Sequence, residues 1–181
     1  IVGLVTTMIA VPFAIFFGVI AGYFGGRVDD VIQFIYITLG SVPGILLISA
    51  IMIIVDAKLQ TSELDQTRTD DYKIMFLCVV LGLIGWSGLC RLLRAETIKL
   101  RELDYVQSAR ALGVNSLVLI PRHIMPNLLH VVLISSILRF SGLVMVEAVL
   151  AYINIGVPLS VESWGRVVNA ARAQLARDPV I

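Results

Sequence analysis

Two charged side chains stand out because they lie inside an apolar stretch. Arg139 and Glu147 both fall within the run 127–155. Arg139 follows Asn127 by about 18 Å at roughly 1.5 Å per helical residue, which is near the middle of a bilayer. A charge at that depth usually pairs with another group or lines a water-filled path. We therefore hypothesise that Arg139 and Glu147 line a translocation path, in which Arg139 would attract a carboxylate and oppose a metal cation; the alternative is that Arg139 fixes helix packing.

Other side chains with chemical potential form no recognisable reaction centre. Cys78 and Cys90 share one apolar run at a spacing that suits neither a metal nor a disulfide framework. His123 and His130 have no second ligand at a suitable distance along the sequence. The motifs HExxH, GxSxG and GxxxxGK[ST] do not occur. We expect no catalytic residue, no metal site and no cofactor bound by this chain.

The segment 104–127 contains signals for the start and the end of a short helix. Asp104 is a candidate N-cap, Ala109 and Ala111 favour helix, and Gly113 is a candidate C-terminal stop. The residues 114–116 indicate a turn and the start of another short helix. Two prolines, Pro121 and Pro126, predict a broken path into the next apolar run.

These residues must be positioned by apolar helices. The chain of 181 residues is 58% hydrophobic and only 15% charged, with a mean hydropathy of +0.93. Four runs are long enough to span a bilayer, at about 1–24, 31–55, 74–93 and 127–155. Lipid leaves backbone groups no water partner, so each run is expected to be helical. The fold class is therefore an all-α polytopic membrane protein.

The loops predict an orientation. Residues 91–122 carry an excess of Arg and Lys, whereas 56–73 are rich in Asp and Glu. Since basic residues gather on the cytoplasmic side, we expect a cytoplasmic loop at about 94–126, an outer loop at 56–73 and an outer tail at 156–181. The net charge of +1 predicts no nucleic-acid partner.

Small residues and prolines predict how the helices pack. Ala14, Gly18 and Gly22 recur at helical spacing, which favours close approach of another helix. A second series consists of Gly82, Gly85 and Gly88. Pro12 and Pro43 are expected to bend their helices. Because Ile1 already lies in an apolar run, we expect this chain to be an internal portion of a longer protein.

The order of residues in 105–127 resembles the EAA loop of permease subunits in binding-protein-dependent ABC importers. Gln107-Ser108-Ala109 stands where Glu-Ala-Ala is usual, Gly113 follows after three residues, and Ile124-Met125-Pro126 supplies the Ile-x-Pro step. The segments 21–29 and 91–96 resemble the dipeptide, oligopeptide and nickel branch of that family, as does Ser163-Trp164-Gly165. This resemblance implies a six-helix permease fold of which the chain carries four spans.

The resemblance also implies a function and its partners. The chain is expected to be a permease of an ATP-driven importer in a bacterial or archaeal cytoplasmic membrane. It would work with two cytoplasmic ATPases that bind ATP and Mg²⁺, a second and usually paralogous permease, and an extracytoplasmic solute-binding protein. The residues implied in ATPase coupling are Tyr105, Gln107, Ser108, Ala109, Arg110, Ala111, Leu112 and Gly113.

Three interpretations of the cargo and class stay open. Di- or oligopeptides are the expected cargo, because the charge of Arg139 would oppose a metal cation. Nickel or another solute is the alternative within the same branch. A different class, an ATP-independent channel, would conduct without nucleotide. An intramembrane enzyme is disfavoured by the absence of the motifs named above.

Overall fold

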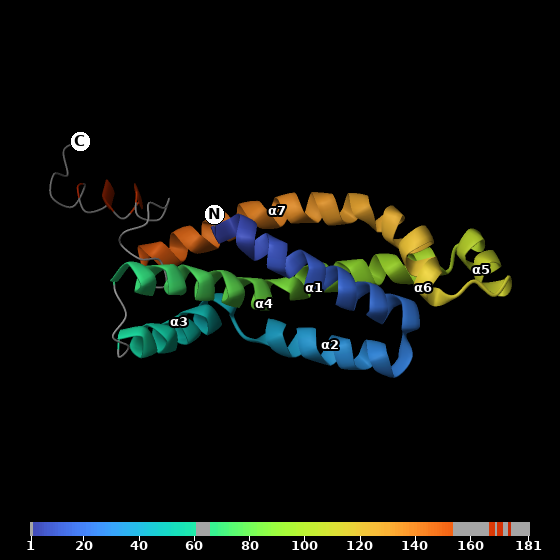
Figure 1. Ribbon diagram of the computed structural model, residues 1–181, viewed down its shortest axis with the longest axis horizontal. Coiled ribbons are helices and arrows are strands. Elements are labelled where there is room, and N and C mark those ends of the chain that lie inside the picture. The colour runs from blue at the N-terminus through green and yellow to red at the C-terminus, as the bar shows by residue number, and fades with distance from the viewer. Residues whose placement is uncertain (1, 61–65, 154–166, 169, 172–173, 175–181) are drawn as a thin grey trace. The chain divides into compact units, whose positions relative to one another are not determined.

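Helices make up nearly all of the residues that the structure describes. The computed structural model describes residues 2–60 and 66–153, together with residues 167, 168, 170, 171 and 174. No strand occurs in these ranges. The elements are α1 (Val2–Phe24), α2 (Gly26–Ser41), α3 (Gly44–Gln60), α4 (Gln66–Arg101), α5 (Asp104–Ala111), α6 (Ser116–Leu119), the π-helical turn η1 (Ile120–Ile124) and α7 (Met125–Tyr152) (Figure 1). The predicted all-α membrane fold is confirmed.

The helices differ from the apolar runs in where they begin and end. Three described helices are long and apolar enough to cross a membrane, or four if α2 and α3 together form one bent span. The run 31–55 is divided because α2 ends at Ser41 and α3 begins at Gly44. Pro43 lies in this break, as expected of a residue that cannot continue a helix. Pro12, by contrast, lies inside the continuous helix α1.

The prediction that Pro121 and Pro126 break the path into the last span is wrong. Helical structure runs without interruption from Ser116 to Tyr152. Pro121 lies in the first turn of η1, and the Met125 amide donates to the carbonyl of Ile120 across this wider turn. A proline is tolerated where its missing N–H would have no partner, and a π-turn re-spaces the backbone around it.

Contacts divide the chain into two compact units. The first unit comprises Ile1–Met8, Val42–Leu83 and Arg139–Ile181, and the second comprises Ile9–Ser41 and Ile84–Leu138. In the first unit, Met52, Leu77 and Leu150 are fully buried. Lys73 pairs with Asp56 at 3.2 Å, which ties α3 to α4.

The second unit is built around a close packing of α1 on α4. A Cβ placed on Gly18 would lie 2.8 Å from the carbonyl oxygen of Cys90, and one on Gly22 would lie 2.7 Å from that of Arg94. Only glycine permits this approach, so the predicted packing face of α1 is confirmed. Phe17 and Trp86 continue the seam, with ring centroids 5.1 Å apart.

Charged groups fasten the same seam near the α1–α2 turn. The Arg94 guanidinium donates two hydrogen bonds to the carboxylate of Asp29, and Gln33 donates a third. Further along α4, Arg101 donates to the carbonyl oxygens of Gly22 at 3.1 Å and of Tyr23 at 3.4 Å. These bonds satisfy carbonyls at the end of α1 that have no partner within the helix. The first turn of α2 and the last turns of α4 are therefore held together.

Two predicted segments lie wholly or partly outside the described residues. The outer loop 56–73 contains residues 61–65, which are not described, and its remaining residues belong to α3 and α4. The outer tail 156–181 lies outside the described residues except at the five positions named above.

Candidate coupling segment

The predicted coupling residues form one short helix and its C-terminal cap. Tyr105 to Ala111 belong to α5, Leu112 is the C-cap, and Gly113 follows with a φ of +80°. The Gly113 amide donates to the carbonyl of Arg110, and the Val114 amide donates to that of Ala109. This pair of bonds is a Schellman motif, which favours glycine at the left-handed position. Gly113 as the helix stop is confirmed.

The predicted role of Asp104 as the N-cap is wrong. Leu103 occupies the N-cap position with extended backbone and no capping side chain, and Asp104 is the first helical residue. The start of α5 is instead joined to the end of α4 by the side chain of Gln107. Its amide donates to the carbonyl of Glu102 at 3.1 Å and to the Glu102 carboxylate at 3.3 Å. An acidic residue in the first turn still favours the helix dipole.

One side of α5 is anchored in the core of the second unit. Val106 is fully buried, and Ala109 and Val114 pack against the same cluster. The guanidinium of Arg110 lies 5.1 Å from the ring centroid of Tyr23, in cation–π geometry. The short helix is thus seated on the end of α1 and is not free in solvent.

The neighbouring helices brace this seat from two sides. The Asn127 side chain, near the start of α7, donates to the Tyr105 hydroxyl at 3.0 Å and to the carbonyl of His123 at 2.7 Å. The Tyr23 hydroxyl donates to Ser116 Oγ at 3.1 Å. Asn115 caps α6 by accepting from the Leu117 amide, as the predicted helix start at 114–116 requires. Contacts from α1, α6 and α7 therefore limit the movement of α5.

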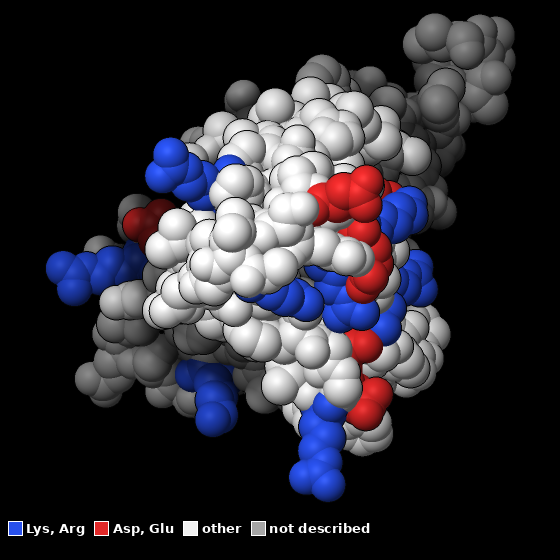
Figure 2. All heavy atoms as spheres, turned by 90° about the vertical axis from the view of Figure 1, so that its right-hand side faces the viewer, with Lys and Arg blue, Asp and Glu red and all other residues white. Residues whose placement is uncertain are grey.

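The other side of α5 is exposed and partly apolar. Leu112 is 85% exposed and Leu117 is 80% exposed, although both are large apolar residues. Gln107, Ser108 and Ala111 are exposed on the same segment. We call Leu103 to Leu117 the coupling segment. Figure 1 shows α5 lying beyond the α1–α2 turn of the second unit. Figure 2 faces this end, where uncharged side chains fill much of the middle, charged ones of both signs cluster at the right, and further charged side chains, mostly basic, stand at the left and bottom.

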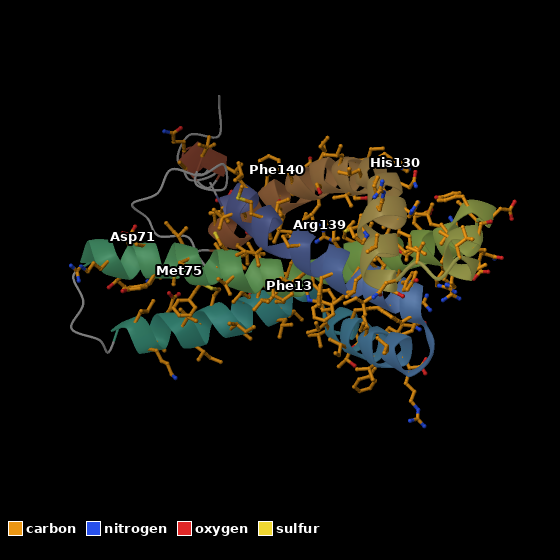
Figure 3. The ribbon with its side chains drawn as sticks, turned by 45° about the vertical axis from the view of Figure 1, so that its right-hand side comes forward. Phe13, Asp71, Met75, His130, Arg139 and Phe140 are labelled. Atoms are coloured by element: carbon orange, nitrogen blue, oxygen red, sulfur yellow. The ribbon has the colours of Figure 1, made fainter. Side chains whose placement is uncertain are left out.

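The two charged residues of the hypothesised path lie on α7. Arg139 and Glu147 are both partly buried and are separated by two helical turns. Figure 3 labels Arg139 beside Phe140 on this helix. Phe140 packs against Gly3 of the same unit, since a Cβ on Gly3 would lie 3.1 Å from its ring. In the part of the chain that the structure describes, no group of three His, Cys, Asp or Glu residues could hold a metal ion.

Several supporting residues were not found from the sequence. Tyr23, Ser116 and Asn127 hold the coupling segment, yet each looks in the sequence like an ordinary interfacial or capping residue. In the sequence, such residues are recognisable only as polar side chains near the end of an apolar run. This signal does not identify their hydrogen-bond partners, because those partners come from helices far apart in the sequence.

The chain belongs to a known class of transport proteins. Residues 14–176 match the family described as binding-protein-dependent transport system inner membrane component. The match covers most of the chain, so the chain belongs to this family. It is a multi-pass inner-membrane protein of a transport system.

The relatives are transport permeases. The chain is 26% identical to the oligopeptide transport system permease protein OppC of Haemophilus influenzae, over 98% of this chain and 52% of that protein. It is 26% identical to the dipeptide transport system permease protein DppC of Lactococcus lactis, over 97% of this chain and 47% of the relative. It is 28% identical to the oligopeptide transport system permease protein OppC of Mycobacterium bovis, over 98% of this chain and 57% of that protein. The chain thus spans about half the length of these curated relatives.

Proposed function

We propose that this chain is the membrane-spanning permease part of an ATP-driven importer and that α5 transmits movement from a cytoplasmic ATPase. The observation that carries the proposal is the two-sided character of the coupling segment. Val106 anchors it in the core, while Leu112 and Leu117 project apolar side chains outward. An exposed apolar patch on a fixed support is typical of a binding surface for another protein.

A coupling element must move as a unit with the helices behind it. The Schellman cap at Gly113 and the Gln107–Glu102 bonds keep α5 short and closed at both ends. The Arg94–Asp29 pair and the Arg101 bonds join α4 to the α1–α2 turn. A force applied at Leu112 would therefore reach α1, α2 and α4 with little lost in local bending.

The family and the chemistry of the chain support the following proposed partners. ATP and Mg²⁺ would be bound by two cytoplasmic ATPase subunits, since this sequence has no phosphate-binding GxxxxGK[ST] loop. A second permease, paralogous to this one, and an extracytoplasmic binding protein would complete the importer.

Peptides are the cargo that the comparisons favour. The relatives are named as oligopeptide and dipeptide permeases. Arg139 on α7 would attract a peptide carboxylate, with Glu147 further along the same path. Both residues are assigned to the translocation path as part of this proposal.

The test is peptide uptake by the assembled transporter in proteoliposomes, with and without ATP. We expect uptake only with ATP and the binding protein. Ala109→Arg would unseat α5 and is expected to abolish stimulation of the ATPase, because Ala109 packs against the core. The control is Arg68→Gln, an exposed position on α4. Uptake that proceeds equally without ATP would instead indicate a channel.

A further inference from the structure

A pocket opens between α2 and α4 within the second unit, away from the coupling segment. Its volume is about 380 Å³, within the range of small-molecule sites. The space exists partly because two glycines face it. The lining includes Tyr36, Gly40 and Ser41 of α2 and Ser87, Gly88 and Arg91 of α4.

Arg91 supplies the positive charge of this pocket. In the described residues, no carboxylate lies within ion-pairing distance of Arg91, and its side chain is exposed. Arg94, one turn further along α4, differs because Asp29 neutralises it. Arg101 differs because it donates to backbone carbonyls. The charge of Arg91 is therefore available to a ligand.

The position of Arg91 along α4 calls for an anionic partner. Arg101 contacts the end of α1, and Arg91 lies about 15 Å from Arg101 at roughly 1.5 Å per residue. Ser41 is the last residue of α2, at the opposite end from Gly26. Arg91 falls at the end of the apolar run 74–93, where an arginine needs water or an anionic partner. A lipid phosphate and a dissolved carboxylate both meet this need, and the other residues that line the pocket distinguish them.

The hydroxyl groups make the pocket complementary to more than an anion. Tyr36 is largely buried, and its hydroxyl has no hydrogen-bond partner among the described residues, so it can donate. Ser41 Oγ donates to the Thr38 carbonyl at 2.7 Å, and Ser87 Oγ donates to that of Ile84 at 3.4 Å. Because these hydroxyls already donate, their lone pairs are left to accept an N–H. A carboxylate beside an amide N–H would satisfy all three kinds of group.

We propose that this pocket is a subsite for the C-terminal carboxylate of a peptide in transit, with Arg91 as its cation and Tyr36 as a second donor. The proposal rests on the peptide cargo proposed above. It assigns a recognised end of the substrate and two specificity-determining residues.

The experiment compares two peptides of one sequence, one with a free C-terminal carboxylate and one with a C-terminal amide. Uptake by the assembled transporter is measured in proteoliposomes at a saturating concentration of peptide-loaded binding protein, whose affinity for each peptide is determined separately. The variants are Arg91→Gln, Arg91→Lys and Tyr36→Phe, with Arg68→Gln as the matched control on α4. ATPase stimulation reports whether each variant is folded and coupled.

We expect Arg91→Gln to slow uptake of the free-carboxylate peptide by about 10-fold, the size typical of one lost charge-assisted bond. Uptake of the amidated peptide and ATPase stimulation should hardly change, and Arg91→Lys should recover part of the loss. Equal effects on both peptides would overturn the subsite. A defect that disappears in vesicles without anionic lipid would assign Arg91 to a lipid phosphate and also overturn it. If the wild type imports neither peptide, the peptide cargo itself fails, and the subsite fails with it.

Discussion

Helices α4 and α7 have the same mean hydropathy in their most apolar windows, yet they are buried to very different extents. In α4, 50% of that window is buried, whereas in the helical span that contains α7 the share is 6%. The difference lies in what faces them. Glycines of α1 and the carboxylate of Asp29 fit against α4, while α7 presents large exposed residues such as Ile137 and Leu138.

An apolar sequence carries two kinds of information. Hydropathy locates a span, but small residues and paired charges decide whether protein covers it. In lipid, burying an apolar side chain gives little driving force, so close packing and hydrogen bonds carry helix association. The exposed side of α7 is then available to lipid or to another subunit, and the α1–α4 seam is the rigid part that supports the coupling segment.

The largest expected effect comes from the buried ion pair. Asp29→Asn should lower the free energy of unfolding by about 3–5 kcal/mol, because Arg94 would lose its charged partner at a site where little water can replace it. Unfolding in mixed micelles measures this. Asp30→Asn is the matched control, since Asp30 is exposed on the next residue. Equal losses for the two variants would contradict the importance of the pair.

A pair of leucines tests the comparison directly. Leu93 on α4 is fully buried, and Leu138 on α7 is 69% exposed. Leu93→Ala should lower the free energy of unfolding by about 2–5 kcal/mol, the usual range for a core leucine, and Leu138→Ala by about 0.5 kcal/mol or less. Unfolding of the isolated chain in mixed micelles measures both losses. A large loss at Leu138 would mean that α7 is packed in the monomer.

Substituting alanine for two glycines is expected to change the free energy of unfolding in opposite directions. A Cβ on Gly22 would lie 2.6 Å from Thr97 Cβ, whereas a Cβ on Gly142 of α7 meets nothing within 4 Å. Gly22→Ala should therefore destabilise by about 1–3 kcal/mol. Gly142→Ala should stabilise by up to about 1 kcal/mol, because alanine favours helix. Thermal unfolding of both variants provides the check, and stabilisation by Gly22→Ala would refute the close seam.

The smallest expected effect concerns the end of α5. Gly113 has a φ of +80°, and a Cβ there would meet nothing within 4 Å, so Gly113→Ala should cost about 1 kcal/mol through backbone strain alone. Gly113→Asn should cost less, since asparagine tolerates this conformation better. Hydrogen exchange of the α5 amides would report the loosened cap. Faster exchange for asparagine than for alanine would argue against the Schellman cap.

Much of the fold could be predicted because it depends on local rules. Apolar length located α1, the position of Gly113 gave the end of α5, and the spacing of Gly18 and Gly22 gave a packing face. Helix ends were harder. The charges that follow residue 93 predicted the end of the apolar span, but they did not show that α4 itself continues to Arg101. Over these last turns, Asp29 and carbonyls of α1 pair with Arg94 and Arg101.

The site was predictable as a segment and less so as a set of contacts. Residues 105–113 fall together on one short helix and its cap, as the sequence indicated. The braces from Tyr23, Ser116 and Asn127 bring distant parts of the chain together, so no local pattern encodes them. The π-turn at Pro121 likewise depends on neighbours, because proline alone predicts a break.

Site-specific photo-crosslinking in the assembled transporter tests whether the coupling segment contacts the ATPase. A photoreactive amino acid is placed at Leu112 of the coupling segment or at Leu138 of α7, both of which are exposed. We expect a crosslink to the ATPase subunit from Leu112, changing in yield with ATP, and none to the ATPase from Leu138. An ATPase crosslink from Leu138 with none from Leu112 would contradict it.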